Sequence, residues 1–389
     1  MSSKTKTTAT KEEPTQALVP KIRFPEFREA EGWLLRTLGE VCEILNNRRR
    51  PITSSGRKPG PYRYYGASGV VDYVDDFIFD ERVILVGEDG AKWGAFERTA
   101  FIVEGQFWVN NHAHVLQPQG VSDVLLTAYL SMTDLAPFVT GAAPPKLTLG
   151  KLKEIPVPIP RVESEGRAIA DCLSSLDELL AAQARKVETL KTHKEGLMEQ
   201  LFPREGETQP RLRFPEFQDA GEWVVRQFDD LFVVGNGRDY KHLEPGDVPV
   251  FGSGGYMLSV KDYLYDGESV CIGRKGTIDK PMFLTGRFWT VDTLFFTHSF
   301  AHCLPRFIFS VFQQIDWSSH NEAGGVPSLS KTNIQKIKTP LPSLPEQARI
   351  ADCLTSLDEL IAAEARTHEA LKTHKKGLMQ QLFPSPSLD

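Results

Sequence analysis

The chain carries one long stretch twice: residues 169–203 read IADCLSSLDELLAAQARKVETLKTHKEGLMEQLFP, and residues 350–384 read IADCLTSLDELIAAEARTHEALKTHKKGLMQQLFP. These blocks of 35 residues differ at 8 positions, so 27 positions match at a constant offset of 181. Unrelated segments would match at only a few positions. Because an internal repeat sets the architecture of a chain, the other features are placed relative to these two blocks.

The repeat continues outside the two blocks in a weaker form. Residues 23–27 (RFPEF) return as residues 213–217, and residues 145–160 are echoed by residues 327–342. Seven further positions return at an offset of 186: Gly66, Gly69, Val74, Asp76, Asp80, Gly87 and Gly90 become Gly252, Gly255, Val260, Asp262, Asp266, Gly273 and Gly276. The chain is therefore predicted to hold two copies of one unit, with near-identical helices and divergent globular parts.

The long blocks have the apolar pattern of a coiled coil. Apolar residues recur at alternating steps of four and three, which predicts a seam that packs against another helix. The seam positions are Ile169, Leu173, Leu176, Leu180, Val187, Leu190, Leu197, Leu201, Ile350, Leu354, Leu357, Ile361, Leu371, Leu378 and Leu382. Polar residues interrupt the seam at Gln183, Lys194, Glu364, His368 and Lys375, as register markers or as solvated gaps.

The helix ends are marked by residues that start and stop helices. Ser343 with Glu346 fits a capping box, Pro345 suits an early helical position, and Pro203 and Pro384 end the two helices. A helix over residues 345–382 would be roughly 55 Å long. The simplest partner for each helix is the other one, in antiparallel orientation, which implies pseudo-two-fold symmetry. The alternative is that each helix packs on its own globular domain.

The globular parts predict a mixed α/β (α+β) fold. Apolar runs at Val83–Gly87 and Ser269–Gly273 predict buried strands, and short helices are expected near 123–133 and 305–315. The predicted organisation is a disordered tail (1–20), a first domain (21–160), a long helix (161–203), a linker (204–210), a second domain (211–342), a second long helix (343–384) and a short tail (385–389).

Composition favours a cytoplasmic protein. No apolar run approaches the roughly 20 residues of a membrane helix, and the first 20 residues lack the apolar core of a secretion signal. The 5 cysteines form no CxxC pair, which fits a reducing compartment. The net charge of −6 argues against nonspecific coating of nucleic acid, but it leaves room for a reader with local basic loops.

Motifs for catalysis are missing from the sequence. The glycine-rich residues 251–255 lack the lysine of a phosphate-binding loop, and residues 143–146 (APPK) do not replace the Asn/Asp-Pro-Pro-aromatic tetrapeptide of amino-methyltransferases. His112 and His114 could face one side of a strand as metal ligands, but no further Cys or His cluster supports a metal site. This favours a binding protein over an enzyme.

The whole layout resembles the specificity (S) subunit of a type I restriction–modification system over about residues 21–384. The matching motifs are residues 272–278 (IGRKGTI), 326–331 (VPSLSK), 340–351 (PLPSLPEQARIA) and the KxGLMxQLFP helix ends. The first copy departs from the pattern in two places. Residues 163–166 (ESEG) stand where the second copy has PEQ, and Glu88-Asp89 replaces Arg274-Lys275.

The resemblance implies two target recognition domains, each reading one half of a bipartite DNA site, with the paired helices fixing the spacer between the halves. It also implies two modification subunits that methylate adenine with S-adenosylmethionine, restriction subunits for cleavage, and no cofactor or catalytic residue on this chain. The alternatives are a coiled-coil scaffold or adaptor whose domains bind proteins, and an enzyme with an unrecognised site.

Basic and aromatic loops are the expected DNA contacts, because arginine and lysine bind phosphates and guanine edges. For each such residue, an ordinary solvated role is the alternative. The candidates are Arg48, Arg49, Arg50, Arg57, Lys58, Arg63 and Tyr65 in the first domain and Arg238, Lys241, Ser253, Tyr256, Arg274, Lys275 and Lys331 in the second.

Overall fold

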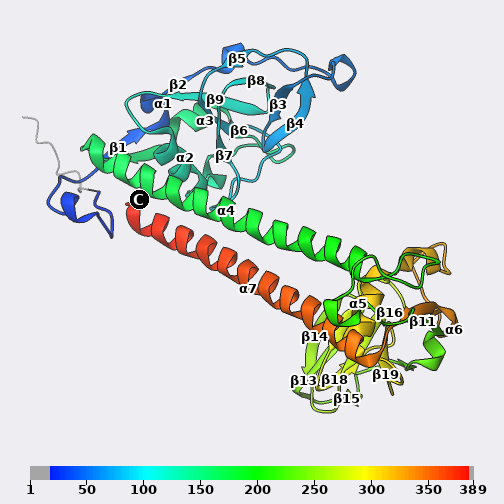
Figure 1. The fold of residues 1–389 in the computed structure, drawn as a ribbon. Coiled ribbons are helices and arrows are strands. Elements are labelled where there is room, and N and C mark those ends of the chain that lie inside the picture. Colours follow the sequence, from blue (N-terminus) through cyan, green and yellow to red (C-terminus); the bar gives the residue numbers. More distant parts are fainter. Residues whose placement is uncertain (1–17, 385–389) are drawn as a thin grey trace, which may run out of the picture. The chain divides into compact units, whose positions relative to one another are not determined.

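The computed structural model describes residues 18–384, which form two compact units. One unit contains the chain up to Ala184 together with the part from Arg366 onward, and the other contains Arg185–Ala365. Each unit therefore holds one globular domain and one half of each long helix (Figure 1). Most of the predicted N-terminal tail (1–17) and the C-terminal tail (385–389) lie outside the described residues.

The first domain consists of two four-stranded sheets and a two-stranded ribbon. The sheet orders are β2-β9-β6-β7, β4-β3-β8-β5 and β1-β10. The strands are β1 (Leu34–Thr37), β2 (Cys42–Ile44), β3 (Tyr62–Gly66), β4 (Gly69–Val74), β5 (Phe79–Asp80), β6 (Val83–Gly87), β7 (Ala100–Val103), β8 (Gln106–Val109), β9 (Ala113–Pro118) and β10 (Pro156–Ile159). The short helices are α1 (Leu38–Val41), α2 (Asp123–Met132) and α3 (Leu149–Glu154).

The second domain repeats this topology strand for strand. Its sheet orders are β12-β19-β16-β17, β14-β13-β18-β15 and β11-β20. The strands are β11 (Val224–Gln227), β12 (Val233–Asn236), β13 (Pro245–Gly252), β14 (Gly255–Val260), β15 (Tyr265–Asp266), β16 (Ser269–Gly273), β17 (Met282–Leu284), β18 (Arg287–Thr290), β19 (Leu294–His298) and β20 (Lys338–Leu341). Its short helices are α5 (Pro305–Gln314) and α6 (Lys331–Lys336).

The predicted core elements are confirmed. β6 and β16 lie at the predicted residues, and all five residues of each are buried. The expected short helices are α2 and α5. The Ser122 hydroxyl caps α2 by accepting a hydrogen bond from the Leu125 amide, as small polar side chains do at helix starts. Among residues 18–384, no helix has both the length and the apolar composition needed to cross a bilayer.

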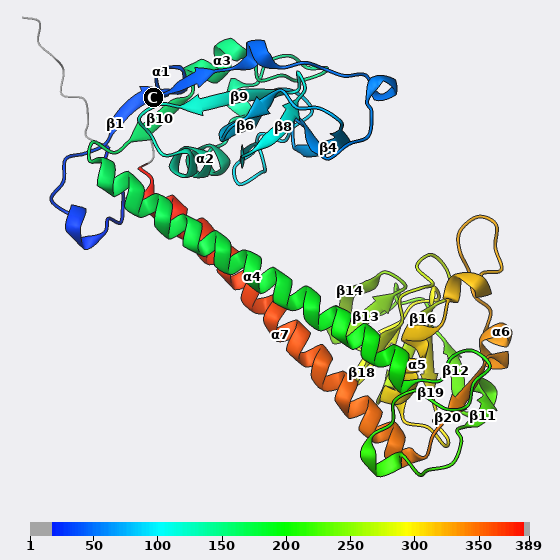
Figure 2. The ribbon, with the colours of Figure 1, turned by 45° about the horizontal axis from the view of Figure 1, so that its top comes forward.

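The long helices α4 (Glu163–Leu201) and α7 (Leu344–Leu382) lie antiparallel against each other in each unit (Figures 1 and 2). In the first unit, Lys375 of α7 pairs with Asp177 of α4. In the second unit, Lys194 of α4 lies 2.7 Å from Asp358 of α7. These two ion pairs are repeat equivalents, because both partners are related by the offset of 181. The same helix-to-helix contact thus occurs in both units.

The polar interruptions of the seam include residues that join the helices. Besides Lys194 and Lys375, Glu364 accepts a hydrogen bond from Lys186 at 2.6 Å. This pair lacks a charged counterpart in the other unit, because Gln183 and Thr367 occupy the equivalent positions. The interruptions at these positions therefore form contacts between the helices and are not simply solvated gaps, so the prediction that they mark the register stays open to test.

Each long helix contacts both the other helix and a domain core. Ile169 and Leu173 of α4 share one hydrophobic cluster with Leu382 and Phe383, together with core residues of the first domain. In the second unit, Leu201 and Phe202 share a cluster with Ile350 and Leu354. The two packing arrangements that the sequence left open therefore coexist. The remaining predicted seam positions are half-buried: Leu176, Leu180, Val187, Leu190, Leu197, Leu357, Ile361, Leu371 and Leu378.

A buried arginine fixes the first turn of each long helix. Arg23 donates to both carboxylate oxygens of Glu165, at 2.7 and 2.8 Å. Arg213 does the same to Glu346, at 2.8 and 2.6 Å. Both oxygens of Glu346 are thus engaged by Arg213, a role that the predicted capping box with Ser343 does not include. The arginine is the first residue of the repeated RFPEF motif.

Candidate nucleic-acid interface

Several loops of the second domain converge on a groove of about 610 Å³. The loop after β12 and the β13–β14 turn line it with Lys241, Ser253 and Tyr256. The turn after β16 is held beside this groove, because the Arg274 amide donates to the Thr293 carbonyl at 2.8 Å. Thr293 itself lines the groove. The loop after β12, the β13–β14 turn and the turn after β16 thus meet at one edge of the groove, which we call the rim.

The basic residues of this rim are available to a ligand. Arg238, Lys241, Arg274 and Lys275 are exposed, and within residues 18–384 no carboxylate forms an ion pair with them. Lys331 is half-buried in the first turn of α6. Ser253 is half-buried, and Tyr256 is 63% exposed with its hydroxyl 3.2 Å from that of Ser259. The predicted second-domain candidates therefore lie on or near one accessible surface.

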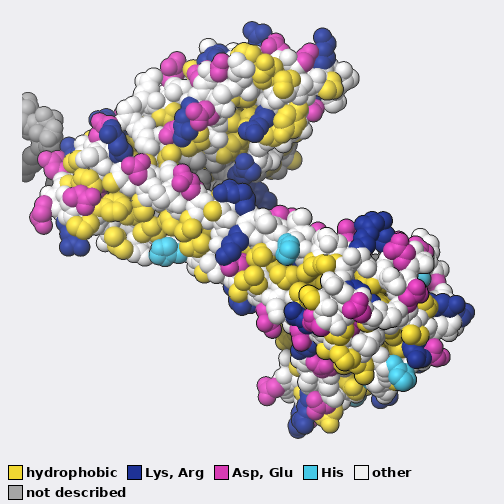
Figure 3. Space-filling model, in the orientation of Figure 1, with side chains coloured by type: hydrophobic (Ala, Val, Ile, Leu, Met, Phe, Trp, Pro, Cys, Tyr) yellow, Lys and Arg dark blue, Asp and Glu magenta, His cyan; other side chains and the backbone are white. Residues whose placement is uncertain are grey.

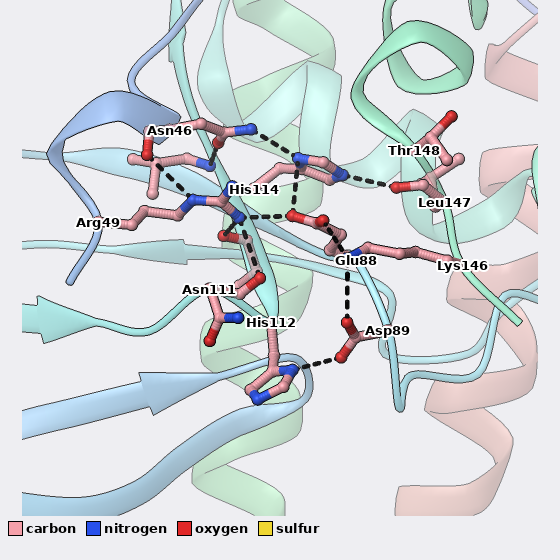
Figure 4. A network of polar contacts seen from close by, with 12 residues as sticks. Asn46, Arg49, Glu88, Asp89, Asn111, His112, His114, Lys146, Leu147 and Thr148 are labelled. Atoms are coloured by element: carbon pink, nitrogen blue, oxygen red, sulfur yellow. Dashed lines mark hydrogen bonds and ion pairs between the residues drawn. The ribbon is translucent and has the colours of Figure 1, made fainter. Parts of the chain in front are cut away.

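The corresponding turn of the first domain is occupied by a network of charges (Figure 4). The Glu88 carboxylate, largely buried, accepts from Arg49 at 2.6 Å and lies 2.8 Å from the Lys146 ammonium. Asp89 pairs with His112 and also with Lys146. Burial would raise the pKa of Glu88, but the hydrogen bonds from Lys146 and Arg49 lower it below its ordinary value.

The buried His114 completes this network from β9. Its Nε2 donates to the Leu147 carbonyl at 2.7 Å, and its Nδ1 accepts from the Asn46 amide at 2.8 Å. These partners require the neutral ring, since a carbonyl only accepts and the Asn46 amide group donates. Burial lowers the pKa of His114, which keeps the ring uncharged.

The two turns have the same backbone and opposite charges. The Glu88 amide donates to the backbone carbonyl of His112, and the Leu147 amide donates to the Glu88 carbonyl, both at 2.8 Å. Arg274 makes the matching bonds with Thr293 and Leu329, at 2.8 and 2.9 Å. The residues around the two turns also differ. Ser328, Thr293 and Phe295 of the second domain occupy the positions of Lys146, His112 and His114 in the first. The charged side chains of the first turn are therefore paired within their domain, whereas those of the second turn form no ion pair among the described residues. We call the first turn closed and the second open in this sense.

The structure separates the predicted first-domain contacts into two groups. Arg48 pairs with Glu81 at 2.7 Å, and Arg57 pairs with Asp72 at 3.1 Å. Arg49 holds the network around Glu88. By contrast, Arg50, Lys58 and Arg63 are exposed, and in the described part of the chain none of them has an ion-pair partner. The pKa of Arg63 is raised by its contacts with Tyr65 and Tyr73.

Tyr65 lies in the core and not at the surface. Only 6% of the residue is exposed, and its ring packs edge-on against Phe107 at a centroid distance of 5.8 Å. It follows Tyr64, which is also buried. A β-bulge between these two residues breaks the alternation by which a strand points successive side chains to opposite faces. Sequence alternation therefore gave no guide to its position.

Metal chemistry finds no support in the described residues. His112 and His114 have different partners, and residues 18–384 contain no group of three or more His, Cys, Asp or Glu side chains that could hold a metal ion. The five cysteines are free thiols. Burial raises the pKa of Cys42, Cys271 and Cys303 to about 12, which makes these thiols unreactive.

Comparison with known families gives a match over most of the chain. The sequence model described as "Type I restriction modification DNA specificity domain" matches twice, over residues 30–192 and 220–373. A putative type I restriction enzyme specificity subunit of Haemophilus influenzae is 27% identical over 352 residues, which cover 84% of this chain and 87% of that protein. The MjaVIII specificity subunit of Methanocaldococcus jannaschii is 22% identical and covers 92% of this chain and 93% of its own length.

Solved structures show the same fold. The crystal structure of a type I restriction–modification S subunit from M. genitalium matches with a TM-score of 0.69 at 17% identity, over 95% of this chain and 100% of that one. A chain from work on complex assembly and conformational transition of the type I R-M system matches with a TM-score of 0.53 at 15% identity, covering 91% and 98%. The predicted fold class is thereby confirmed.

Proposed function

The chain belongs to the family of type I restriction–modification DNA specificity subunits, and from this premise we propose that its two globular domains are target recognition domains, each reading one half of a bipartite DNA site. The observation that carries the proposal is the contrast between the domains. Their strand orders are identical, whereas the turns after β6 and β16 carry opposite charges. Two domains that share a fold but differ in the charge of this turn are suited to a DNA site whose two halves differ in sequence.

The open rim of the second domain has the chemistry of a DNA-contacting surface. Arginine and lysine bind phosphate oxygens, and arginine also reads guanine through two hydrogen bonds. The net charge of −6 implies that the chain does not hold DNA through general electrostatic attraction. We therefore assign part of the phosphate grip to partner subunits.

The partners that we propose are two modification subunits, which carry S-adenosylmethionine and methylate adenine, and restriction subunits that join for cleavage. This chain binds no cofactor of its own in the proposal, and it acts in the cytoplasm. The long helices set the spacer between the half-sites. The near-identity of the helical blocks suits one kind of partner bound twice.

An exposed leucine marks a candidate docking point on each helix. Leu179 is 48% exposed in the first unit, and its equivalent Leu360 is 42% exposed in the second. In both copies the leucine directly follows an Asp-Glu pair. Hydrophobic side chains reach the surface beside charged ones along the paired helices (Figure 3). Serine at both positions should abolish co-purification of a modification subunit while the helices stay paired.

The test is DNA binding by the assembled complex. Gel-shift assays on random duplexes, with and without the modification subunit, should show sequence-selective binding only in its presence. Methyladenine positions mapped after co-expression should define a bipartite motif. If the complex shows no sequence preference at any salt concentration, the proposal is wrong.

Two other functions predict different results in the same assay. Membership of a DNA specificity family argues against the adaptor interpretation. An adaptor would assemble with proteins without binding DNA selectively. A stand-alone enzyme would methylate DNA without the partner.

A further inference from the structure

Arg50 is held at its backbone while its side chain is free. Its amide donates to the Val109 carbonyl at 3.2 Å, and its carbonyl accepts from the Trp108 indole at 2.5 Å. Both polar backbone groups are thus tied to the end of β8. The side chain is exposed, and among the described residues nothing bonds to its guanidinium group.

Arg238 has the same arrangement in the second domain. Its amide donates to the Thr290 carbonyl at 2.8 Å, and its carbonyl accepts from the Trp289 indole at 2.8 Å. Trp108 and Trp289 are the third residues of the equivalent strands β8 and β18. The Arg238 guanidinium is exposed and also lacks a bonding partner within residues 18–384.

The neighbouring arginines of the first domain do not share this freedom. Arg48 pairs with Glu81 and lies over the Phe79 ring at 4.4 Å, and Arg49 is bonded to Glu88. Of the Arg48–Arg50 run, only Arg50 therefore combines a fixed backbone with an unpaired side chain. This is the feature that the second domain repeats at Arg238.

The two domains carry opposite charges at the turns after β6 and β16. Glu88 and Asp89 are paired with Arg49 and Lys146 within the first domain, whereas Arg274 and Lys275 are exposed and without an ion pair in the described chain. The negative side chains of the first turn are thus replaced by positive ones on the same backbone. The two turns can therefore recognise different groups of a ligand.

We propose that Arg50 and Arg238 are equivalent phosphate anchors, one in each domain, and that Arg274 reads a guanine in the half-site of the second domain only. This proposal rests on the proposed function. Phosphate contacts position a protein on DNA without regard to sequence, whereas contacts to base edges specify it. Two copies that diverge to read different sequences can therefore keep the same anchor, while the base-reading residue changes.

The experiment compares single variants in the complex with modification subunits. The motif is first mapped with the unaltered chain. Binding of R50Q, R238Q and R274Q is then measured across a salt series, on the mapped duplex and on duplexes with one base pair changed. K153Q, at the C-terminal end of α3, removes an exposed charge as a control. R50K and R238K keep the charge.

The two classes of residue should give different results. R50Q and R238Q should each lower the slope of log K against log salt concentration by about 1, with equal loss on all duplexes and an unchanged methylation motif. R50K and R238K should restore the slope. R274Q should lose between about 5-fold and about 150-fold of discrimination at one G·C pair of one half-site.

Other outcomes would overturn the proposal. A changed base preference in R50Q or R238Q, or an unchanged salt slope, excludes the phosphate anchors. If R274Q retains every base preference, Arg274 is not the reader. These results are distinct from failure of the proposed function, in which the unaltered complex itself shows no selectivity. Thermal unfolding equal to that of K153Q checks that each variant is folded.

Discussion

His114 and Phe295 occupy the same position in β9 and β19, but only the histidine can take up a proton. The ring of His114 is fully buried, and its partners Leu147 and Asn46 fit the neutral form. Protonation would set a second N–H against the Asn46 amide group in a buried site, and this burial outweighs the opposing attraction of the Glu88 carboxylate, 3.6 Å from Nδ1. The first domain therefore contains a titratable group that the second domain lacks at this position.

This difference predicts a pH-dependent stability. Burial lowers the pKa of His114 below the ordinary value of 6.5, so the unfolded chain binds a proton more readily than the folded one. The stabilisation is full above pH 6.5 and is lost as pH falls further. His114→Phe should flatten the decrease in the free energy of unfolding between about pH 7 and pH 5, measured by urea unfolding with circular dichroism.

An exposed histidine provides the control for this measurement. His193→Ala removes an imidazole from the exposed surface of α4 and serves as the matched variant. An equal pH dependence in His114→Phe and the unaltered chain would contradict the assignment. Below about pH 4.5 a further loss is expected in both, because the pKa of Glu88 is also lowered in the folded state.

Gln347 is a second residue whose role is visible only in the folded structure. It is completely buried at the start of α7. Its amide group donates to the His302 and Pro342 carbonyls, both at 3.0 Å, and its oxygen accepts from the Leu304 amide at 2.9 Å. Since Glu165 and Glu346 are equivalent, Gly166 occupies this position in the first copy.

Removing the Gln347 side chain should destabilise the second unit. Gln347→Ala leaves two carbonyls and one amide without partners in a buried site, which should lower the free energy of unfolding by about 2 kcal/mol. Differential scanning calorimetry measures the change. Gln200→Ala, an exposed glutamine on α4, should have almost no effect. A loss of equal size in both variants would mean that the Gln347 bonds contribute little.

At the scale of elements, the pairing of α4 with α7 depends on ion pairs as well as on the apolar seam. Lys194 is 9% exposed and bonds both carboxylate oxygens of Asp358, at 2.7 and 2.8 Å. Its own aliphatic chain is covered by the packing at the seam. A lysine at this depth requires an opposite charge, so the pair fixes the register of the helices.

Charge exchange tests this pair. Asp358→Lys should destabilise the chain by about 2 kcal/mol, because two ammonium groups would meet at a partly buried site. Adding Lys194→Asp should recover a substantial part of that loss. The coupling energy comes from a double-mutant cycle based on urea unfolding. A coupling energy of zero would mean that apolar packing alone sets the register.

At the scale of the whole molecule, the two near-identical helices connect two readers of different chemistry. Each helix has 39 residues, which is long compared with an average helix.

A change of helix length should therefore alter the DNA spacer. Inserting four residues into α4 adds about 6 Å. We expect the methylation motif to keep both half-sites and to change the number of bases between them. Methyladenine mapping after co-expression gives the motif, and replacement of four residues at the same place is the control. An unchanged spacer would contradict the role of the helices as a ruler.

The sequence alone determined the duplication, the coiled-coil seam, the buried strands β6 and β16 and the family. These features follow from local periodicity or from direct repetition, which need no knowledge of distant contacts. Of the candidate surface, it identified the open rim at Arg274 and Lys275. It could not separate Arg50 from Arg49, because adjacent residues in a loop look alike until their partners are known.

Tertiary structure decided which charges are free. Glu88 forms ion pairs with Arg49 and Lys146, which lie 39 and 58 positions away along the chain. Arg23 binds Glu165, which lies 142 positions away. Whether a charged side chain is paired or open depends on the groups that folding brings within a few ångströms of it, and sequence spacing does not encode that distance. The duplicated helices could therefore be predicted from the sequence, whereas the difference between the two rims could be explained only by the fold.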